Sequence, residues 1–304
     1  MANILQLLHD YTFQVVAIGT GMLGILSGII GSLAVLRKES LLGDALSHAA
    51  LPGIVVGFML VGHKNLMLML LGATVSGLLA TILIRWISKG SIKMDASLSL
   101  ILSSFFALGL VLLTQAQKTP NAQQAGLKNF IYGQASAMLK GDVITIVVTG
   151  LIFIALIILF WKELKAQTFD PVFFSTLAFS PKLVQFVFSL ILVVTVILGL
   201  ESVGVILMSA LLISPPVAAR QWTNRLETMV ILSGCFGLAA GLIGTLWSSM
   251  TRNMPTGPAI VLVASIIVLF SILFAPNRGL LARSWQYHQR KKHYQKIMRE
   301  RGQD

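Results

Sequence analysis

An aspartate and a histidine stand four residues apart in the apolar stretch LLGDALSHAALPG, residues 41–53. On a helix, positions i and i+4 share a face, so Asp44 and His48 would point the same way. A carboxylate and an imidazole suit manganese, iron or zinc as a ligand set. They could equally form a satisfied buried pair without any ligand. Two ligands do not fill a coordination shell, so the spacing alone leaves both interpretations open.

The neighbours of this pair indicate its depth and the character of its helix. Counting ~1.5 Å per residue from Lys38, which we expect at the headgroups, Asp44 lies about 9 Å inward and His48 about 15 Å. That is near the middle of a hydrocarbon core ~30 Å thick. Ser47 adds a hydroxyl, and Pro52 cannot donate a backbone hydrogen bond, which predicts a helix break. Ionisable residues at such depth usually face a pathway, and interrupted helices carry substrate sites in transporters.

The composition indicates the kind of protein that positions these residues. Of the 304 residues, 56% are hydrophobic and 11% are charged, and the mean hydropathy is +0.84. Soluble domains have roughly 25% charged residues, so the fold class is an all-α polytopic membrane bundle. We predict about nine transmembrane helices, or eight, because Glu201 separates two of them by very little. The predicted segments are 13–36, 42–61, 65–85, 96–116, 142–161, 183–200, 202–219, 228–249 and 256–275, with the run 121–140 left at the surface.

Charge predicts the orientation and the domain organisation. If the N-terminus lies outside the cell, only five of the 23 basic residues also lie outside, namely Lys64, Lys118, Lys128, Lys140 and Arg252. The positive-inside rule therefore favours an outside N-terminus and a cytoplasmic C-terminus. Residues 1–275 form a single transmembrane domain, and 276–304 form a basic cytoplasmic tail. The net charge of +12 sits at span ends and in this tail, which indicates membrane lipids or a protein partner and no nucleic acid.

Several segments carry a resemblance to a known family. LRKESLLGDALSHAALPGIVVGF looks like the hallmark segment of the zinc/manganese/iron-type permeases of ATP-binding cassette importers. Its fourth span is resembled by DASLSLILSSFFALGLVLL, and its cytoplasmic coupling region by KELKAQTFDPVFFSTLAFSP. Its later spans are resembled by VGVILMSALLISPPVAARQW and MPTGPAIVLVAS, and the similarity runs in order over roughly residues 13–275.

The resemblance implies a function and a set of partners. The chain would be a multi-pass permease of a bacterial cytoplasmic (inner) membrane that imports manganese, zinc or iron. Asp44 and His48 match the family's proposed metal ligands, and the metal would be cargo, with no cofactor bound permanently. The implied partners are ATPase subunits, a second permease chain, identical or paralogous, and an extracytoplasmic metal-binding protein.

The ATPase must be another chain, because the sequence contains no G-x-x-x-x-G-K-[ST] phosphate-binding loop. The chain itself is therefore expected not to be an enzyme. Residues 162–182, the coupling loop, would face the cytoplasm and dock the ATPase; a helix that only anchors the bundle is the alternative. An Asp-Pro before an apolar turn favours a short helix start. The candidate coupling residues are Glu163, Phe169, Asp170, Pro171, Phe173 and Phe174.

Other features add packing predictions and alternatives. The adjacent Pro215 and Pro216 predict a second helix break along the pathway. Gly24, Gly28 and Gly31 recur at helical spacing, which favours close helix packing. A proton-coupled secondary metal transporter, with the Asp–His pair as relay, is the alternative function. An intramembrane metalloenzyme is disfavoured because the chain has no H-E-x-x-H motif.

Overall fold

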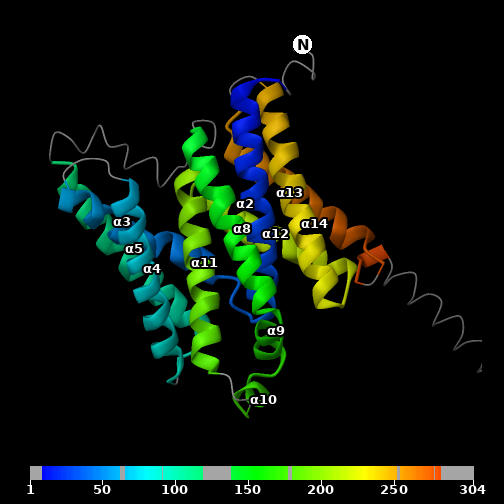
Figure 1. Ribbon diagram of the computed structural model, residues 1–304, viewed down its shortest axis with the longest axis horizontal. Coiled ribbons are helices and arrows are strands. Elements are labelled where there is room, and N and C mark those ends of the chain that lie inside the picture. Colours follow the sequence, from blue (N-terminus) through cyan, green and yellow to red (C-terminus); the bar gives the residue numbers. More distant parts are fainter. Residues whose placement is uncertain are drawn as a thin grey trace, which may run out of the picture.

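The computed structural model describes residues 9–61, 66–90, 92–118, 138–176, 180–251, 254–276 and 278–281. Most of these residues are α-helical, and the helices form a membrane-type bundle (Figure 1). The predicted surface run 121–140 lies outside the described residues except for its last three. The predicted tail 276–304 lies outside them except for residues 276 and 278–281.

The predicted spans correspond to long helices. Eight helices of the described residues are long and apolar enough to cross a membrane, the lower of the two predicted numbers. The predicted segment 202–219 forms α12, which contains two prolines and is not one of the eight. The helices are α2 (Tyr11–Leu36), α3 (Leu42–Val61), α4 (Leu66–Ser88), α5 (Met94–Ala116), α8 (Lys140–Leu159), α9 (Trp161–Phe169), α10 (Pro171–Thr176), α11 (Pro181–Val203), α12 (Val205–Trp222), α13 (Leu226–Met250) and α14 (Thr256–Phe274).

The boundary between α11 and α12 differs from the predicted one. We expected Glu201 to separate two spans, but Glu201 lies within α11. The helices meet at Gly204, whose φ of 86° is the left-handed region that a glycine adopts without steric cost. Its N–H donates to the carbonyl oxygen of Leu200 and closes α11. Backbone conformation, not charge, therefore sets this boundary.

The central helix α2 packs closely against α13 through small residues. A Cβ on Gly24 would collide with the backbone of Gly237, and one on Gly28 would collide with the backbone of Ser233. The hydroxyl of Ser233 donates to the carbonyl oxygen of Gly28 at 2.7 Å. Gly31 is likewise against the backbone of α12. The predicted glycine contacts are confirmed, since small residues let helix backbones approach closely in a membrane.

A second group of helices positions the Asp–His pair. Figure 1 shows α3, α4 and α5 to one side of α2, and α13 and α14 to the other. Helices α3 and α4 cross where Gly53 meets Gly72. The predicted helix breaks are wrong as interruptions: α3 continues through Pro52, and α12 continues through Pro215 and Pro216. Packing against neighbouring helices holds such a proline within a continuous membrane helix.

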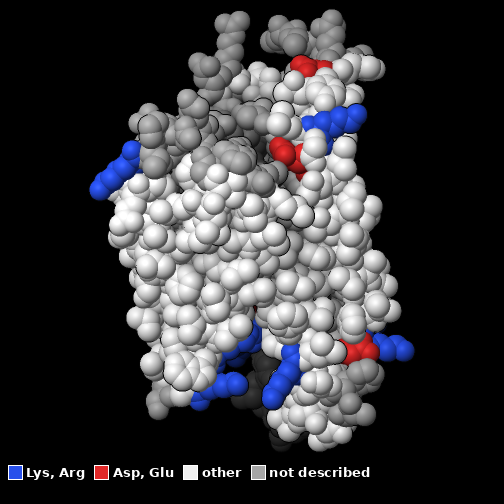
Figure 2. Space-filling view, turned by 60° about the vertical axis from the view of Figure 1, so that its left-hand side comes forward, with Lys and Arg blue, Asp and Glu red and all other residues white. Residues whose placement is uncertain are grey.

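Charged residues gather at the end of the bundle that carries α9, which we call the α9 end. Arg37 follows α2 and contacts α9, and Arg85 in the last turn of α4 pairs with nearby Glu39. Lys165 of α9 pairs with Glu227 in the first turn of α13. Figure 2 shows most of the visible lysine and arginine side chains at one end, beyond a broad uncharged band. An uncharged band between charged ends is expected of a protein whose middle faces hydrocarbon.

Candidate functional site

The Asp–His pair lies at the beginning of α3. Asp44 occupies the first turn, where backbone N–H groups have no intrahelical partner and favour a negative charge. Oδ1 of Asp44 is 3.8 Å from Nε2 of His48, so the two side chains share a face as the spacing predicts. The Asp44 side chain is 43% exposed and the His48 side chain 25%. Both can therefore be reached by a ligand.

A serine from another helix completes this face. The hydroxyl of Ser209 on α12 is 3.1 Å from Oδ1 of Asp44, and 3.1 Å from the carbonyl oxygen of Val205. Its one hydrogen serves one acceptor at a time. Ser209 was not predicted as a site residue, and its signal in the sequence is a polar residue within the apolar run VILMSALLI. Ser209 therefore links α12 to α3, the helix that carries Asp44 and His48.

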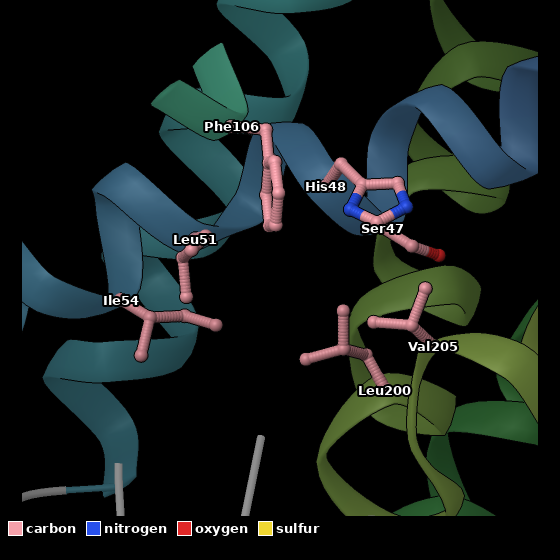
Figure 3. Close-up of a pocket in the computed structure, with 7 residues that line it drawn as sticks. All are labelled: Ser47, His48, Leu51, Ile54, Phe106, Leu200 and Val205. Carbon is pink, nitrogen blue, oxygen red and sulfur yellow. The ribbon is translucent and has the colours of Figure 1, made fainter. Parts of the chain in front are cut away.

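A small pocket lies beside His48, with a volume of about 10 Å³. The His48 ring stands edge-on to Phe106 of α5, with 4.8 Å between ring centroids, as Figure 3 shows. Ser47 also lines the pocket, and its hydroxyl donates to the carbonyl oxygen of Gly43 at 2.9 Å. The full lining is Ser47, His48, Leu51, Ile54, Phe106, Leu200 and Val205. The space is that of about one water molecule, so the site is narrow.

The pair offers an incomplete metal shell. Among the residues described, no group of three or more His, Cys, Asp or Glu side chains could hold a metal ion together. Asp44 and His48 would therefore need water or backbone oxygens as further ligands. Pro52 cannot donate the helix hydrogen bond that the carbonyl of His48 would otherwise accept. An incomplete shell of this kind suits a cation that passes through, because a transported ion must leave its site as well as enter it.

The coupling loop folds into two short helices, α9 and α10. Asp170 caps α10, because its Oδ1 accepts from the N–H of Phe173 at 2.9 Å, and Pro171 is the first helical residue. This confirms the predicted helix start. Phe169 and Phe173 are 61% and 57% exposed, whereas Phe174 is buried at 1%. Phe174 therefore anchors α10 to the bundle, and its role in coupling stays a prediction.

The remaining coupling candidate, Glu163, lies in the first turn of α9. Its Oε2 atom is buried without a hydrogen-bond partner in the structure. On the same helix, Leu164 is fully buried, so α9 rests against the bundle on one side. The short helix thus has the two faces expected of an element at a membrane surface.

The guanidinium of Arg37 connects α2 to α9. Its Nε donates to Oγ1 of Thr168 at 3.0 Å, and a terminal nitrogen donates to the carbonyl oxygen of Leu164 at 3.4 Å. The guanidinium carbon lies 4.1 Å from the ring centroid of Phe188. Burial lowers the pKa of Arg37 to about 10, with Glu39 acting in the opposite direction. The group therefore stays charged at physiological pH.

Comparisons with known proteins match almost the whole chain. The model of the family described as the ABC 3 transport family matches residues 9–275. The zinc transport system membrane protein TroC of Treponema pallidum is 46% identical over 287 residues, covering 94% of this chain and 96% of that protein. The manganese transport system membrane protein MntC of Bacillus subtilis is 42% identical over 281 residues, which cover 92% of this chain and 64% of that protein.

A solved structure agrees with the fold. PsaBC from Streptococcus pneumoniae, in complex with Fab, superposes with a TM-score of 0.79 at 32% identity. The match covers 92% of this chain and 98% of the compared chain. The helical bundle described above is therefore shared with a solved relative.

Proposed function

Because this chain belongs to the ABC 3 transport family as the membrane permease of an ATP-binding cassette importer, we propose that it carries manganese or zinc and that Asp44 and His48 hold the cation on its way through the bundle. The ATPase of such an importer is a separate chain. The names of the two relatives above support the choice of metals, since one is a zinc system and the other a manganese system. The same donor atoms would also accept iron.

The observation that carries the proposal is the geometry of the pair. A carboxylate oxygen and an imidazole nitrogen 3.8 Å apart on one helix face can bind the same cation with small side-chain movements. The Ser209 hydroxyl contacts the carboxylate from α12 and would orient it. Groups that orient a ligand in this way usually matter for metal affinity.

Metal accumulation by cells tests the pair. Asp44→Ala and His48→Ala should each abolish accumulation while the protein still reaches the membrane. Asp142→Asn is the matched control, because Asp142 caps the start of α8 through the N–H of Leu139, away from α3. Normal uptake by a well-expressed Asp44→Ala variant would contradict the proposal.

We also propose that α10 docks the ATPase. The exposed Phe169, Val172 and Phe173 form an apolar surface on and beside this short helix. Such side chains anchor protein interfaces when a partner covers them. Phe173→Ala should release the ATPase from the purified importer, whereas Ser175→Ala, an exposed change on the same helix, should not. Retention of the ATPase by Phe173→Ala at wild-type stoichiometry would refute this docking surface.

We propose the orientation with the N-terminus outside and α9 in the cytoplasm. The basic residues at the α9 end support it through the positive-inside rule. Lys140 begins α8, which ends beside α9, so Lys140 lies at the opposite end. In a Cys235→Ala background, a cysteine at Lys140 should react with an impermeant reagent added to intact cells. A cysteine at Lys162 should react only after the cells are permeabilised, and labelling of it in intact cells would overturn the orientation.

The family resemblance also supports two further partners. We propose a second permease chain, identical or paralogous, beside this one, and an extracytoplasmic metal-binding protein that delivers the cation. Cross-linking in membranes tests both: one product should contain two permease chains, and another should contain the permease and a binding protein. A permease that transports metal as a single chain would contradict the proposed assembly.

A further inference from the structure

We propose that Arg37 is a positioning residue that transmits movement of the coupling helices to α3, the helix that carries Asp44 and His48. This inference rests on the proposed function, since it takes α10 as the docking site of the ATPase. It assigns the link between the docking site and the metal site to the short turn of residues 37–41. That turn separates the end of α2 from the beginning of α3.

One end of the link is the contact between Arg37 and α9. The guanidinium makes a fork: one nitrogen donates to the Thr168 hydroxyl and another to the Leu164 carbonyl oxygen. Thr168 itself donates to the Leu164 carbonyl oxygen, at 2.6 Å. The planar guanidinium holds its donors in fixed directions, which a lysine could not reproduce. Any displacement of α9 would therefore pull on Arg37.

A second set of contacts fixes Arg37 laterally. The guanidinium lies over the ring of Phe188 on α11. The amide of Gln185, one turn earlier, accepts from Arg37 at 3.3 Å, or from Arg85 when the amide is turned over. A guanidinium with these partners on α9 and α11 has little freedom to move independently of them.

The other end of the link is the turn itself. The N–H of Glu39 donates to the Ala34 carbonyl oxygen at 2.8 Å, and the N–H of Leu42 donates to the Glu39 carbonyl oxygen at 3.0 Å. Within the loop that the first of these bonds closes, Lys38 has a φ of 59°, which a non-glycine residue adopts rarely. The backbone is therefore held on both sides of a strained residue, and a shift of Arg37 reaches Leu42 through few free torsions.

The same turn also reaches α4. The carboxylate of Glu39 pairs with the guanidinium of Arg85 at 3.1 Å, and Glu39 is only 13% exposed. Helix α4 packs on α3 where Gly53 meets Gly72. Movement of the turn would thus displace α3 by two routes, directly at its first residues and indirectly through α4. Asp44 is the third residue of α3, so it lies where the displacement enters.

The test measures ATP hydrolysis and metal uptake by the complete importer in proteoliposomes, using manganese as the probe. Arg37→Ala should keep the ATPase bound and hydrolysing, while the number of ions imported per ATP falls at least about fivefold. Arg37→Lys should rescue only part of this ratio, because it keeps the charge and loses the fork. A merely structural role would lower both rates together and leave the ratio unchanged.

The matched control is Glu227→Gln. It breaks the exposed ion pair between α9 and α13, which does not involve the turn. The control should keep the wild-type ratio, since an exposed pair contributes little. Thr168→Val serves as the second variant if Arg37→Ala does not fold, because it removes one contact of the fork; it should also lower the ratio.

Two results would overturn the inference. One is a wild-type ratio in Arg37→Ala or, if that variant does not fold, in Thr168→Val. The other is an equal fall in the number of ions imported per ATP in Glu227→Gln, which would show that any contact between α9 and the bundle couples the two processes. Failure of the proposed docking site would look different, because Phe173→Ala would then retain the ATPase, independently of the results for the Arg37 variants.

Discussion

Removal of the Ser209 hydroxyl should weaken metal transport without abolishing it. The hydroxyl lies 3.1 Å from Oδ1 of Asp44 and comes from a different helix. Hydrogen bonds between membrane helices contribute on average about 0.6 kcal/mol and at most about 1.7 kcal/mol. These energies correspond to roughly 3-fold and 18-fold changes in an equilibrium constant. Because the Asp44 side chain is 43% exposed and water can replace the lost donor, we expect a change near the lower figure.

The assay is metal uptake by proteoliposomes as a function of metal concentration, for Ser209→Ala and Ser209→Thr. Ser209→Ala should raise the half-saturating concentration about threefold, because the carboxylate is less well oriented. Ser209→Thr keeps a hydroxyl and should remain within about twofold of wild type. A complete loss of uptake in Ser209→Ala, or no change in half-saturation, would refute the assignment of Ser209 as an orienting group.

Three further outcomes follow from the structure. Gly53→Val should lower the free energy of unfolding by about 1–3 kcal/mol through overpacking against Gly72, and so lower the yield of folded protein. Gly141→Ala should not, because a Cβ there meets open space, and equal yields of the two variants in gel filtration would contradict this. Phe174→Ala should lower the melting temperature, because a buried aromatic is lost, by more than Phe173→Ala; equal melting temperatures would count against the anchor. The lowered pKa of Arg37 makes its charged form unfavourable to folding, a cost that stays constant below about pH 10 and is relieved only above it. The difference in melting temperature between wild type and Arg37→Met should therefore not change between pH 6 and 9, and a clear change would refute this.

The sequence predicts the helices better than their contacts. Each predicted span is an apolar window, and such a window must be helical because lipid cannot satisfy its backbone groups. The shared face of Asp44 and His48 follows from helical spacing alone and is confirmed. The predicted interruptions at Pro52, Pro215 and Pro216 are wrong, because α3 and α12 continue through them. A local rule cannot include the neighbouring helices that hold a proline in place.

Side-chain roles that depend on the fold could not be predicted. Arg37 stands next to Lys38 in a short basic turn, and nothing in the local sequence indicates that its side chain contacts Phe188 and Thr168, more than 100 residues away along the chain. Phe173 and Phe174 are adjacent and chemically identical, yet one is exposed and the other buried, because α10 is a helix with one face on the bundle. Ser209 has no motif around it, so only the packing of α12 on α3 reveals it.

Uptake of radioactive manganese by proteoliposomes that contain the permease and its ATPase tests the central claim most directly. The wild-type importer should accumulate manganese with ATP and without a proton gradient, and Asp44→Ala should accumulate none although its ATPase remains bound. Wild-type accumulation by Asp44→Ala, or accumulation driven by a proton gradient without ATP, would contradict the account.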